Sequence, residues 1–157
     1  MMARRRFRTN VIAAIAVVAL VATACGPEEE PEDEGAATVE VTLQEFSVVP
    51  SATSAPLGEV TFDVTNSGPE DIHEFVVFAT DLAPDALPTN ADGSVDETGA
   101  GVELIGEIED IAVGDTQSTT MALEAGSYVF VCNILESEGT ETISHYQQGM
   151  RVGFTAD

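Results

Sequence analysis

The sequence contains no lysine and no tryptophan, and its only side chains that are positively charged at neutral pH are five arginines among 157 residues. Binding to nucleic acid phosphates needs a basic patch, so nucleic acid is excluded as a partner. There is also no G-x-S-x-G motif, and the acidic residues form no recognisable pair, so nothing supports hydrolytic chemistry. We therefore expect the protein not to be an enzyme.

The N-terminus has the pattern of an export signal. Four of the five arginines lie between Arg4 and Arg8, ahead of the apolar run VIAAIAVVALVATA from Val11 to Ala24. A basic start followed by a short apolar run is typical of a signal peptide, and this run is too short to cross a bilayer as a helix. We expect residues 1–24 to direct export and then to be removed.

The cleavage site allows two interpretations. The stretch VATAC, which ends at Cys25, resembles the lipobox of bacterial lipoproteins. That resemblance implies that Cys25 is lipidated, becomes the new N-terminus and anchors the protein to the outer face of the cytoplasmic membrane. Ordinary cleavage after Ala24 is the alternative, and it would leave Cys25 as a free thiol.

A tether follows the cleavage site. The run GPEEEPEDEGAA, residues 26–37, is rich in proline and glutamate and has no apolar pattern. Such a segment repels itself and stays extended. At about 3.1 Å per residue in a polyproline-like conformation, it could hold a domain about 35–40 Å from a membrane. We expect residues 25–37 to form this tether and residues 38–157 to form a single domain, which we expect to be a monomer.

The mature chain is strongly acidic. After removal of the signal, only Arg151 faces all 28 carboxylates, a net charge near −27. The acidic residues are scattered along the domain, and their mutual repulsion destabilises a compact state unless salt screens it. A salty habitat and an acidic docking face for a cationic partner are both consistent with this pattern.

The domain has the period of β-strands. Apolar residues alternate in TVEVTLQEF and EVTFDVTNSG, while EFVVFAT and YVFVCNI are denser apolar runs, as in strands buried on both faces. Turn signals separate these stretches, and no long helical period occurs. The pattern predicts an all-β sandwich of about seven to eight strands. Thr80 to Gly101 is predicted to be a long loop with a short helical turn near residues 81–87.

Four side chains in the domain are typical metal ligands. His73 lies at the edge of one predicted strand, Cys132 ends another, His145 follows 13 positions later, and Met150 comes next. One thiolate, two imidazoles and a thioether match the trigonal His₂Cys set with a weak axial methionine that copper electron-transfer sites use. A lone thiol in an oxidising compartment is a liability unless something occupies it.

Each of these residues also has an ordinary structural interpretation. Cys132 could be an inert core cysteine on a strand, and His73 or His145 could be a solvated or hydrogen-bonded histidine. Met150 could fill a gap in the core. Taken together, however, both histidines and the only spare cysteine fall into a single metal-binding pattern, which favours copper.

The segments that carry these residues resemble the cupredoxins, the small blue copper proteins such as plastocyanin and azurin. The first histidine lies within the segment VTFDVTNSGPEDIHEF, and the other ligands come from GSYVFVCN and SHYQQGMRVGF. The resemblance covers about residues 39–154. It implies a Greek-key β-sandwich with one type 1 copper ion at one end, held by His73, Cys132, His145 and, axially, Met150. It also implies that His145 is the ligand nearest to solvent.

The chain departs from the familiar members of that family in two ways. Twelve residues separate Cys132 from His145, where those members have only a few, and Glu74 stands where many have an asparagine that ties the two ligand loops together. Lengthening a loop two- to threefold costs about 0.6–1 kcal/mol in closure entropy. Thiolate–imidazole metal sites are worth on the order of 10 kcal/mol, so the longer loop does not abolish binding.

The resemblance implies a carrier of single electrons that meets its redox protein partners transiently while the lipid on Cys25 holds it at the membrane. A multicopper oxidase needs more histidines than this chain has, and a binuclear copper centre needs two cysteines in one loop. Two alternatives stay open: a periplasmic copper carrier or scavenger, and a metal-free β-sandwich that serves as an interaction module.

Overall fold

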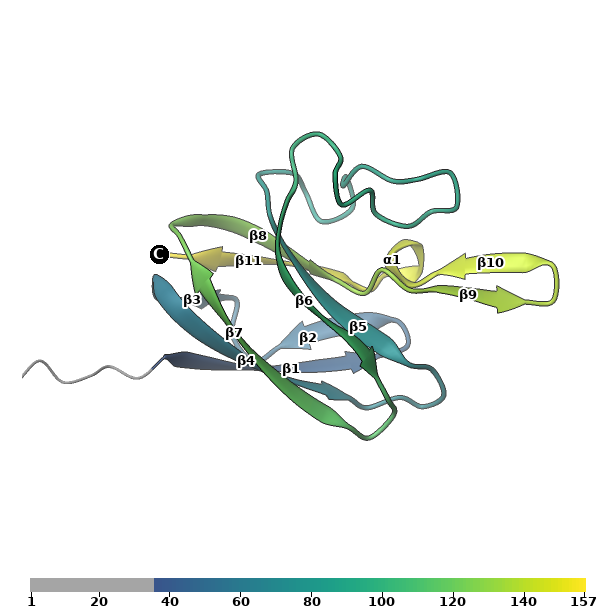
Figure 1. Cartoon of the computed structure of the whole chain (residues 1–157), viewed down its shortest axis with the longest axis horizontal. Coiled ribbons are helices and arrows are strands. Elements are labelled where there is room, and N and C mark those ends of the chain that lie inside the picture. Colours follow the sequence, from purple (N-terminus) through teal and green to yellow (C-terminus); the bar gives the residue numbers. More distant parts are fainter. Residues whose placement is uncertain (1–35) are drawn as a thin grey trace, which may run out of the picture. The chain divides into compact units, whose positions relative to one another are not determined.

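The computed structural model describes residues 36–157, which form strands and one short helix (Figure 1). The elements are β1 (Ala37–Gln44), β2 (Ser47–Pro50), β3 (Ser54–Ala55), β4 (Gly58–Asn66), β5 (His73–Ala79), β6 (Glu103–Ile111), β7 (Thr116–Leu123), β8 (Gly126–Val131), β9 (Leu135–Glu138), β10 (Glu141–Ser144), α1 (His145–Gln148) and β11 (Arg151–Ala156). Within these residues no helix has the length and apolar character that crossing a membrane requires.

The strands form the two sheets of a sandwich, so the predicted all-β fold is confirmed. One sheet has the order β2-β1-β4-β7 and the other the order β3-β11-β8-β5-β6. Seven of these strands have six residues or more, as the sequence predicts, and the short β2 and β3 extend the sheets. The β9–β10 pair is a separate hairpin inside the segment between Cys132 and His145.

Strand β4 shows how the alternating pattern builds the first sheet. Val60, Phe62 and Val64 are fully buried against the second sheet. The intervening threonines lie on the outer face, where Thr61 and Thr65 each form a hydroxyl hydrogen bond to a threonine of β7, at 2.9 and 2.8 Å. Such cross-strand pairs stabilise a sheet. One apolar face and one polar face therefore follow directly from the period of two.

Strand β5 is buried on both faces, as its dense apolar run predicts. Phe75 and Val77 join the core between the sheets, while Val76 and Phe78 pack on the other face with Leu87 and other residues outside β5. Fully burying a side chain of this size is worth about 1.5–3 kcal/mol. The segment between β5 and β6 supplies the second cover, so this long loop is part of the core.

Four phenylalanines fill the centre of the sandwich. Their ring centroids lie between 4.7 and 6.2 Å apart, mostly in edge-on arrangements that aromatic pairs prefer. They are Phe62, Phe75, Phe130 and Phe154. The cluster joins β4 to β5, β8 and β11 and fixes the spacing of the strands that carry the candidate site.

The helical turn expected near residues 81–87 is wrong. The segment contains no helix, only a turn in which the Ala86 amide donates to the Ala83 carbonyl at 2.9 Å. Pro88 disfavours the helical conformation at Leu87, which shortens any helix there. The loop is instead held by the Tyr146 hydroxyl, which accepts from the Leu87 amide at 3.2 Å and donates to the Pro84 carbonyl at 2.9 Å.

Candidate metal centre

The two central strands of the second sheet bring His73 and Cys132 to the same end of the sandwich. His73 is the first residue of β5, and Cys132 follows the last residue of β8. These strands pair antiparallel, with Val76 opposite Val131, so the start of one lies beside the end of the other. Sequence positions 59 residues apart therefore become neighbours.

The short helix α1 brings in His145. Its N-cap is Ser144, whose hydroxyl accepts the Gln147 amide at 3.3 Å and donates to the Gly93 carbonyl at 2.8 Å. A serine at this position satisfies an amide that the first helical turn leaves unpaired. The cap fixes the helix against the long loop, and His145 is its first residue. Figure 1 shows α1 between the hairpin β9–β10 and the sandwich.

The three side chains converge on one point. Cys132 Sγ lies 3.4 Å from His145 Nδ1 and 3.8 Å from His73 Nδ1, and the two Nδ1 atoms lie 3.2 Å apart. A thiolate and two imidazole nitrogens at these separations can all reach one small ion, with metal–nitrogen and metal–sulfur bonds of about 2.0–2.3 Å. This triangle, with all three residues buried, is the candidate metal centre.

Burial keeps the thiol protonated in the absence of a metal. Removal from water raises the pKa of Cys132 to about 12, although the amide of Glu74, which donates to Sγ at 3.4 Å, opposes the shift. Burial and the neighbouring His145 also lower the pKa of His73, so its ring is neutral near pH 7. A soft metal ion that replaces the thiol proton would therefore find the neutral His73 imidazole ready to bind.

Met150 lies in the turn that closes the site. It is fully buried, its carbonyl accepts the Cys132 amide at 3.1 Å, and its amide donates to the His145 carbonyl at 3.0 Å. Its side chain also belongs to the core between the sheets. Its role as an axial ligand stays a prediction, as does the assignment of the other three residues as ligands.

Glu74 links the two segments that carry the candidate ligands. Its Oε1 accepts the amide of Asn133 at 2.8 Å, next to Cys132. Burial raises the pKa of Glu74 to about 7, and Glu107, Glu97 and Glu109 add to the rise through their negative charge. The residue that departs from the cupredoxin pattern thus still makes a hydrogen bond between the His73 strand and the Cys132 segment.

The exposed fractions do not single out His145 as the candidate ligand nearest to solvent, so this stays a prediction. The side chains of His73 and His145 are both 0% exposed. The β9–β10 hairpin contributes to the burial of His145, because it carries Glu136, whose Oε2 lies 3.5 Å from His145 Nε2. Phe46 adds an edge-on aromatic contact, with 5.2 Å between the ring centroids. The inserted residues therefore cover the ligand that the resemblance places nearest to solvent.

Two carboxylates that no sequence pattern marks lie beside the histidines. Glu45 Oε1 lies 3.6 Å from His73 Nε2, and Glu136 occupies the matching place at His145. Glu45 comes from the turn between β1 and β2, and Glu136 from β9. In a chain with 28 acidic residues no spacing distinguishes these two, so only their position in space identifies them.

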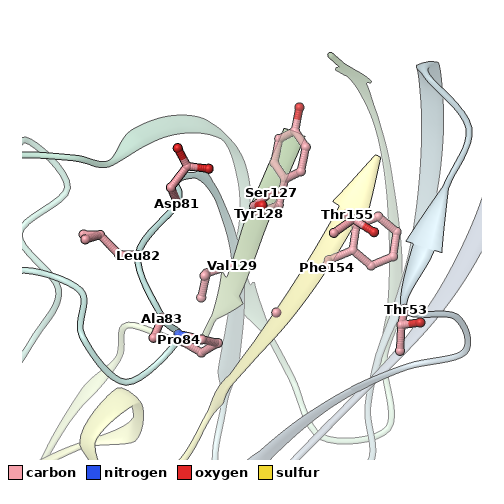
Figure 2. Close-up of a pocket in the computed structure, with 11 residues that line it drawn as sticks. Thr53, Asp81, Leu82, Ala83, Pro84, Ser127, Tyr128, Val129, Phe154 and Thr155 are labelled. Carbon is pink, nitrogen blue, oxygen red and sulfur yellow. The ribbon is translucent and has the colours of Figure 1, made fainter. Parts of the chain in front are cut away.

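A separate groove lies at the other end of β8. It has a volume of about 360 Å³, and Figure 2 shows Asp81 to Pro84 on one side and Tyr128 and Phe154 on the other. No candidate ligand lines it. The groove is therefore distinct from the candidate metal centre. Cys25, the expected signal and residues 25–35 of the expected tether lie outside the described residues, so these predictions are untested. Ala37, predicted as the end of the tether, instead begins β1 and pairs with Val60 of β4.

The sequence matches no family model. It also matches no curated protein sequence. Comparison with solved structures finds dithionite-reduced auracyanin from Roseiflexus castenholzii, with a TM-score of 0.53 and 21% identity over 78% of this chain and 99% of the other. Auracyanin A, a "blue" copper protein from Chloroflexus aurantiacus, has a TM-score of 0.51 and 18% identity over 78% and 100%.

Rusticyanin from Thiobacillus ferrooxidans is similar at a TM-score of 0.52 and 17% identity, over 78% of this chain and 79% of the other. These neighbours are cupredoxins. The β-sandwich with strands β5, β8 and β11 leading to one end is therefore the cupredoxin fold, as the sequence resemblance implies.

Proposed function

We propose that this protein is an exported type 1 copper protein that carries single electrons between redox partners by cycling between Cu(I) and Cu(II). The observation that carries the proposal is the buried triangle of Cys132 Sγ, His73 Nδ1 and His145 Nδ1, with sides of 3.2 to 3.8 Å. The cupredoxin fold adds support, and auracyanin A, which shares it, is a blue copper protein.

The chain's own residues would provide what electron transfer requires. Cys132, His73 and His145 would hold copper, with Met150 as a weaker fourth donor, and the bound ion would supply the one-electron couple. The two sheets and the capped helix position these three side chains. Little rearrangement would then accompany a change of oxidation state, because the protein and not the ion sets the positions of the donors.

The burial of the site favours electron transfer over copper delivery. A carrier that passes copper to a partner must let the partner's ligands replace its own, whereas His73, Cys132 and His145 are all completely buried. Electrons can cross a few ångströms of protein, but a metal ion cannot leave without opening the fold. The convergence of three metal-binding side chains also speaks against a metal-free interaction module.

Placement at the membrane forms a second part of the proposal. The apolar N-terminal run, the cysteine at position 25 and the acidic tether support a lipoprotein on the outer face of the cytoplasmic membrane. A tethered domain would meet membrane-bound redox proteins at high effective concentration. Its contacts with them would be small and short-lived.

Visible absorption tests the proposal. The purified protein with one equivalent of Cu(II) should show an intense thiolate-to-copper charge-transfer band that reductant bleaches and oxidant restores. Cys132→Ser should abolish the band, and His145→Ala should weaken or shift it strongly. A protein that binds only Cu(I) and shows no cycling would support the copper carrier instead. A protein that takes up no copper would support the interaction module.

A further inference from the structure

Each histidine of the candidate centre has a carboxylate behind it. His73 Nε2 faces Glu45 Oε1 at 3.6 Å, and His145 Nε2 faces Glu136 Oε2 at 3.5 Å. Both Nε2 atoms are buried, and neither has a hydrogen-bond partner at normal distance within the described part of the chain. The two ring nitrogens that point away from Cys132 thus share the same arrangement.

The chemistry of imidazole gives these carboxylates a role. A neutral ring carries one proton, and a ring that binds a metal through Nδ1 must carry that proton on Nε2. A buried N–H group needs an acceptor, and leaving it without one costs about 1–3 kcal/mol. Glu45 and Glu136 are the acceptors that face the two Nε2 atoms. A small approach of each pair would close a charge-assisted hydrogen bond.

Backbone amides hold Glu45 in place. Its Oε1 accepts the amides of Glu70 at 3.1 Å and Asp71 at 2.7 Å, in the segment just before His73. The carboxylate is only 11% exposed, and its Oε2 is buried without a hydrogen-bond partner in the described residues. Holding a carboxylate in a fixed, largely buried position costs free energy, and more so in a strongly acidic chain. A hydrogen bond from the His73 ring would offset that cost.

The hairpin holds Glu136. Residue 136 lies on β9 opposite Ile143 of β10, one residue before the helix cap Ser144. The same hairpin covers His145. The insertion between Cys132 and His145 therefore both buries this histidine and places a carboxylate beside it. Asp71 lies close to both residues: one of its carboxylate oxygens is within 4.8 Å of a carboxylate oxygen of Glu136 and of a ring nitrogen of His145.

We propose that Glu45 and Glu136 are positioning residues for the metal, accepting hydrogen bonds from Nε2 of His73 and His145 respectively. They hold both rings in the tautomer that leaves Nδ1 free, and their negative charge strengthens the imidazoles as donors to Cu(II) more than to Cu(I). The inference rests on the proposed function. It adds that this chain favours the oxidised ion through two carboxylates, one of which its own insertion supplies.

The first test reads the tautomers directly and needs no copper chemistry. The full chain, labelled with ¹⁵N and loaded with one equivalent of Zn(II), should show both imidazoles protonated at Nε2, with these protons protected from solvent exchange. Glu45→Gln should shift only the His73 Nε2 proton, and Glu136→Gln only that of His145. Zn(II)-bound rings protonated at Nδ1, or protons unmoved by either substitution, would overturn the inference.

The second test compares the two oxidation states. Each glutamine variant should lose about 10-fold or more in Cu(II) affinity with a smaller loss for Cu(I), since removing such partners typically costs 10- to 100-fold in metal affinity. A tenfold difference between the two losses raises the reduction potential by about 59 mV. Equal losses for both ions, or none, would contradict the inference.

Matched controls separate contact from total charge. Glu40→Gln on β1 and Glu141→Gln on β10 remove the same charge from exposed positions in the neighbouring elements. They should change either affinity less than twofold, and an equal effect would show that bulk charge is responsible. The wild-type chain could also bind a second Zn(II) ion that Glu136→Gln no longer binds. That result would contradict the hydrogen bond to His145 and would indicate a cation held by Asp71, Glu136 and His145. Failure of the wild-type chain to bind any metal would instead overturn the proposed function.

Discussion

Cys132 Sγ lies 3.4 Å from His145 Nδ1, although a complete β-hairpin separates the two residues along the chain. The hairpin leaves and returns at nearly the same place, because β9 and β10 pair antiparallel and Ser144 lies opposite Leu135. The His145 amide also donates to the Ile134 carbonyl at 3.0 Å. The two ends of the long insertion therefore lie as close together as the ends of a short loop between the two candidate ligands would.

This geometry predicts that the tip of the hairpin is dispensable for metal binding. Replacing residues 137–142 with Asn-Gly would leave Glu136 opposite Ile143 and join them by a two-residue turn, for which Asn-Gly is the preferred sequence. We expect the copper colour to persist and the free energy of unfolding to change by about 1 kcal/mol or less. Loss of the charge-transfer band in this variant, measured beside the wild-type protein, would show that the tip of the hairpin is needed for copper binding.

Met150 should tune the reduction potential without being needed for folding. Met150→Leu conserves volume and should lower the free energy of unfolding by less than about 1.5 kcal/mol. Loss of the thioether donor should destabilise Cu(II) and raise the potential by tens of millivolts, since a tenfold change in relative affinity is about 59 mV.

The control for Met150 is Met121→Leu, at a buried methionine of β7 in the same core. It should produce a similar change in stability and no change in potential, both measured by denaturant unfolding and protein-film voltammetry. If the two variants behave alike, Met150 is a core residue and not a ligand.

The Cys132 thiol should be unreactive in the folded, metal-free protein. Its side chain is fully buried and its pKa is about 12, so the reactive thiolate is scarce at pH 8. We expect alkylation by iodoacetamide to be at least about 1,000-fold slower than in denaturant, where the pKa of the thiol is about 8.5. Rapid labelling of the native protein would show that the site opens readily.

The same labelling in denaturant also tests Cys25. One reactive thiol per mature chain is the expected count if Cys25 carries lipid through its sulfur, and two are expected after ordinary cleavage. Intact mass measurement should show the matching increase from the lipid.

Glu107 should make stability depend on pH. Partial burial, with Glu97 and Glu109 nearby, raises the pKa of its carboxyl, so the folded state ionises it less readily than the unfolded chain. The contribution of Glu107 to the free energy of unfolding is therefore fully present below its ordinary pKa of about 4.5, and it is lost as the pH rises through the raised pKa.

Glu107→Gln should then increase the free energy of unfolding at pH 7 by about 0.5 kcal/mol or less, and the gain should vanish near pH 3 and shrink in 1 M salt. Urea unfolding at the three conditions measures it. Glu59→Gln, on β4 of the other sheet, removes one charge elsewhere and serves as the control. An equal gain in both variants at pH 7 would assign the effect to total charge.

Local pattern alone determined much of this protein. The alternation in β4 and the dense run in β5 predict strands with one and two buried faces, because side chains alternate across a strand and each apolar one must leave water. The rarity of histidine and spare cysteine made His73, Cys132 and His145 conspicuous. A set so small can be read from a sequence because few other residues compete with it.

Only the tertiary structure decided how these residues meet. The antiparallel pairing of β5 and β8 places His73 beside Cys132, and the hairpin that buries His145 depends on register between β9 and β10, which no short-range pattern specifies. Glu45 and Glu136 were indistinguishable among 28 carboxylates until the fold set each beside an imidazole. A scarce residue type can be recognised as functional from the sequence. The role of a common type such as glutamate becomes clear only from its neighbours in the folded structure.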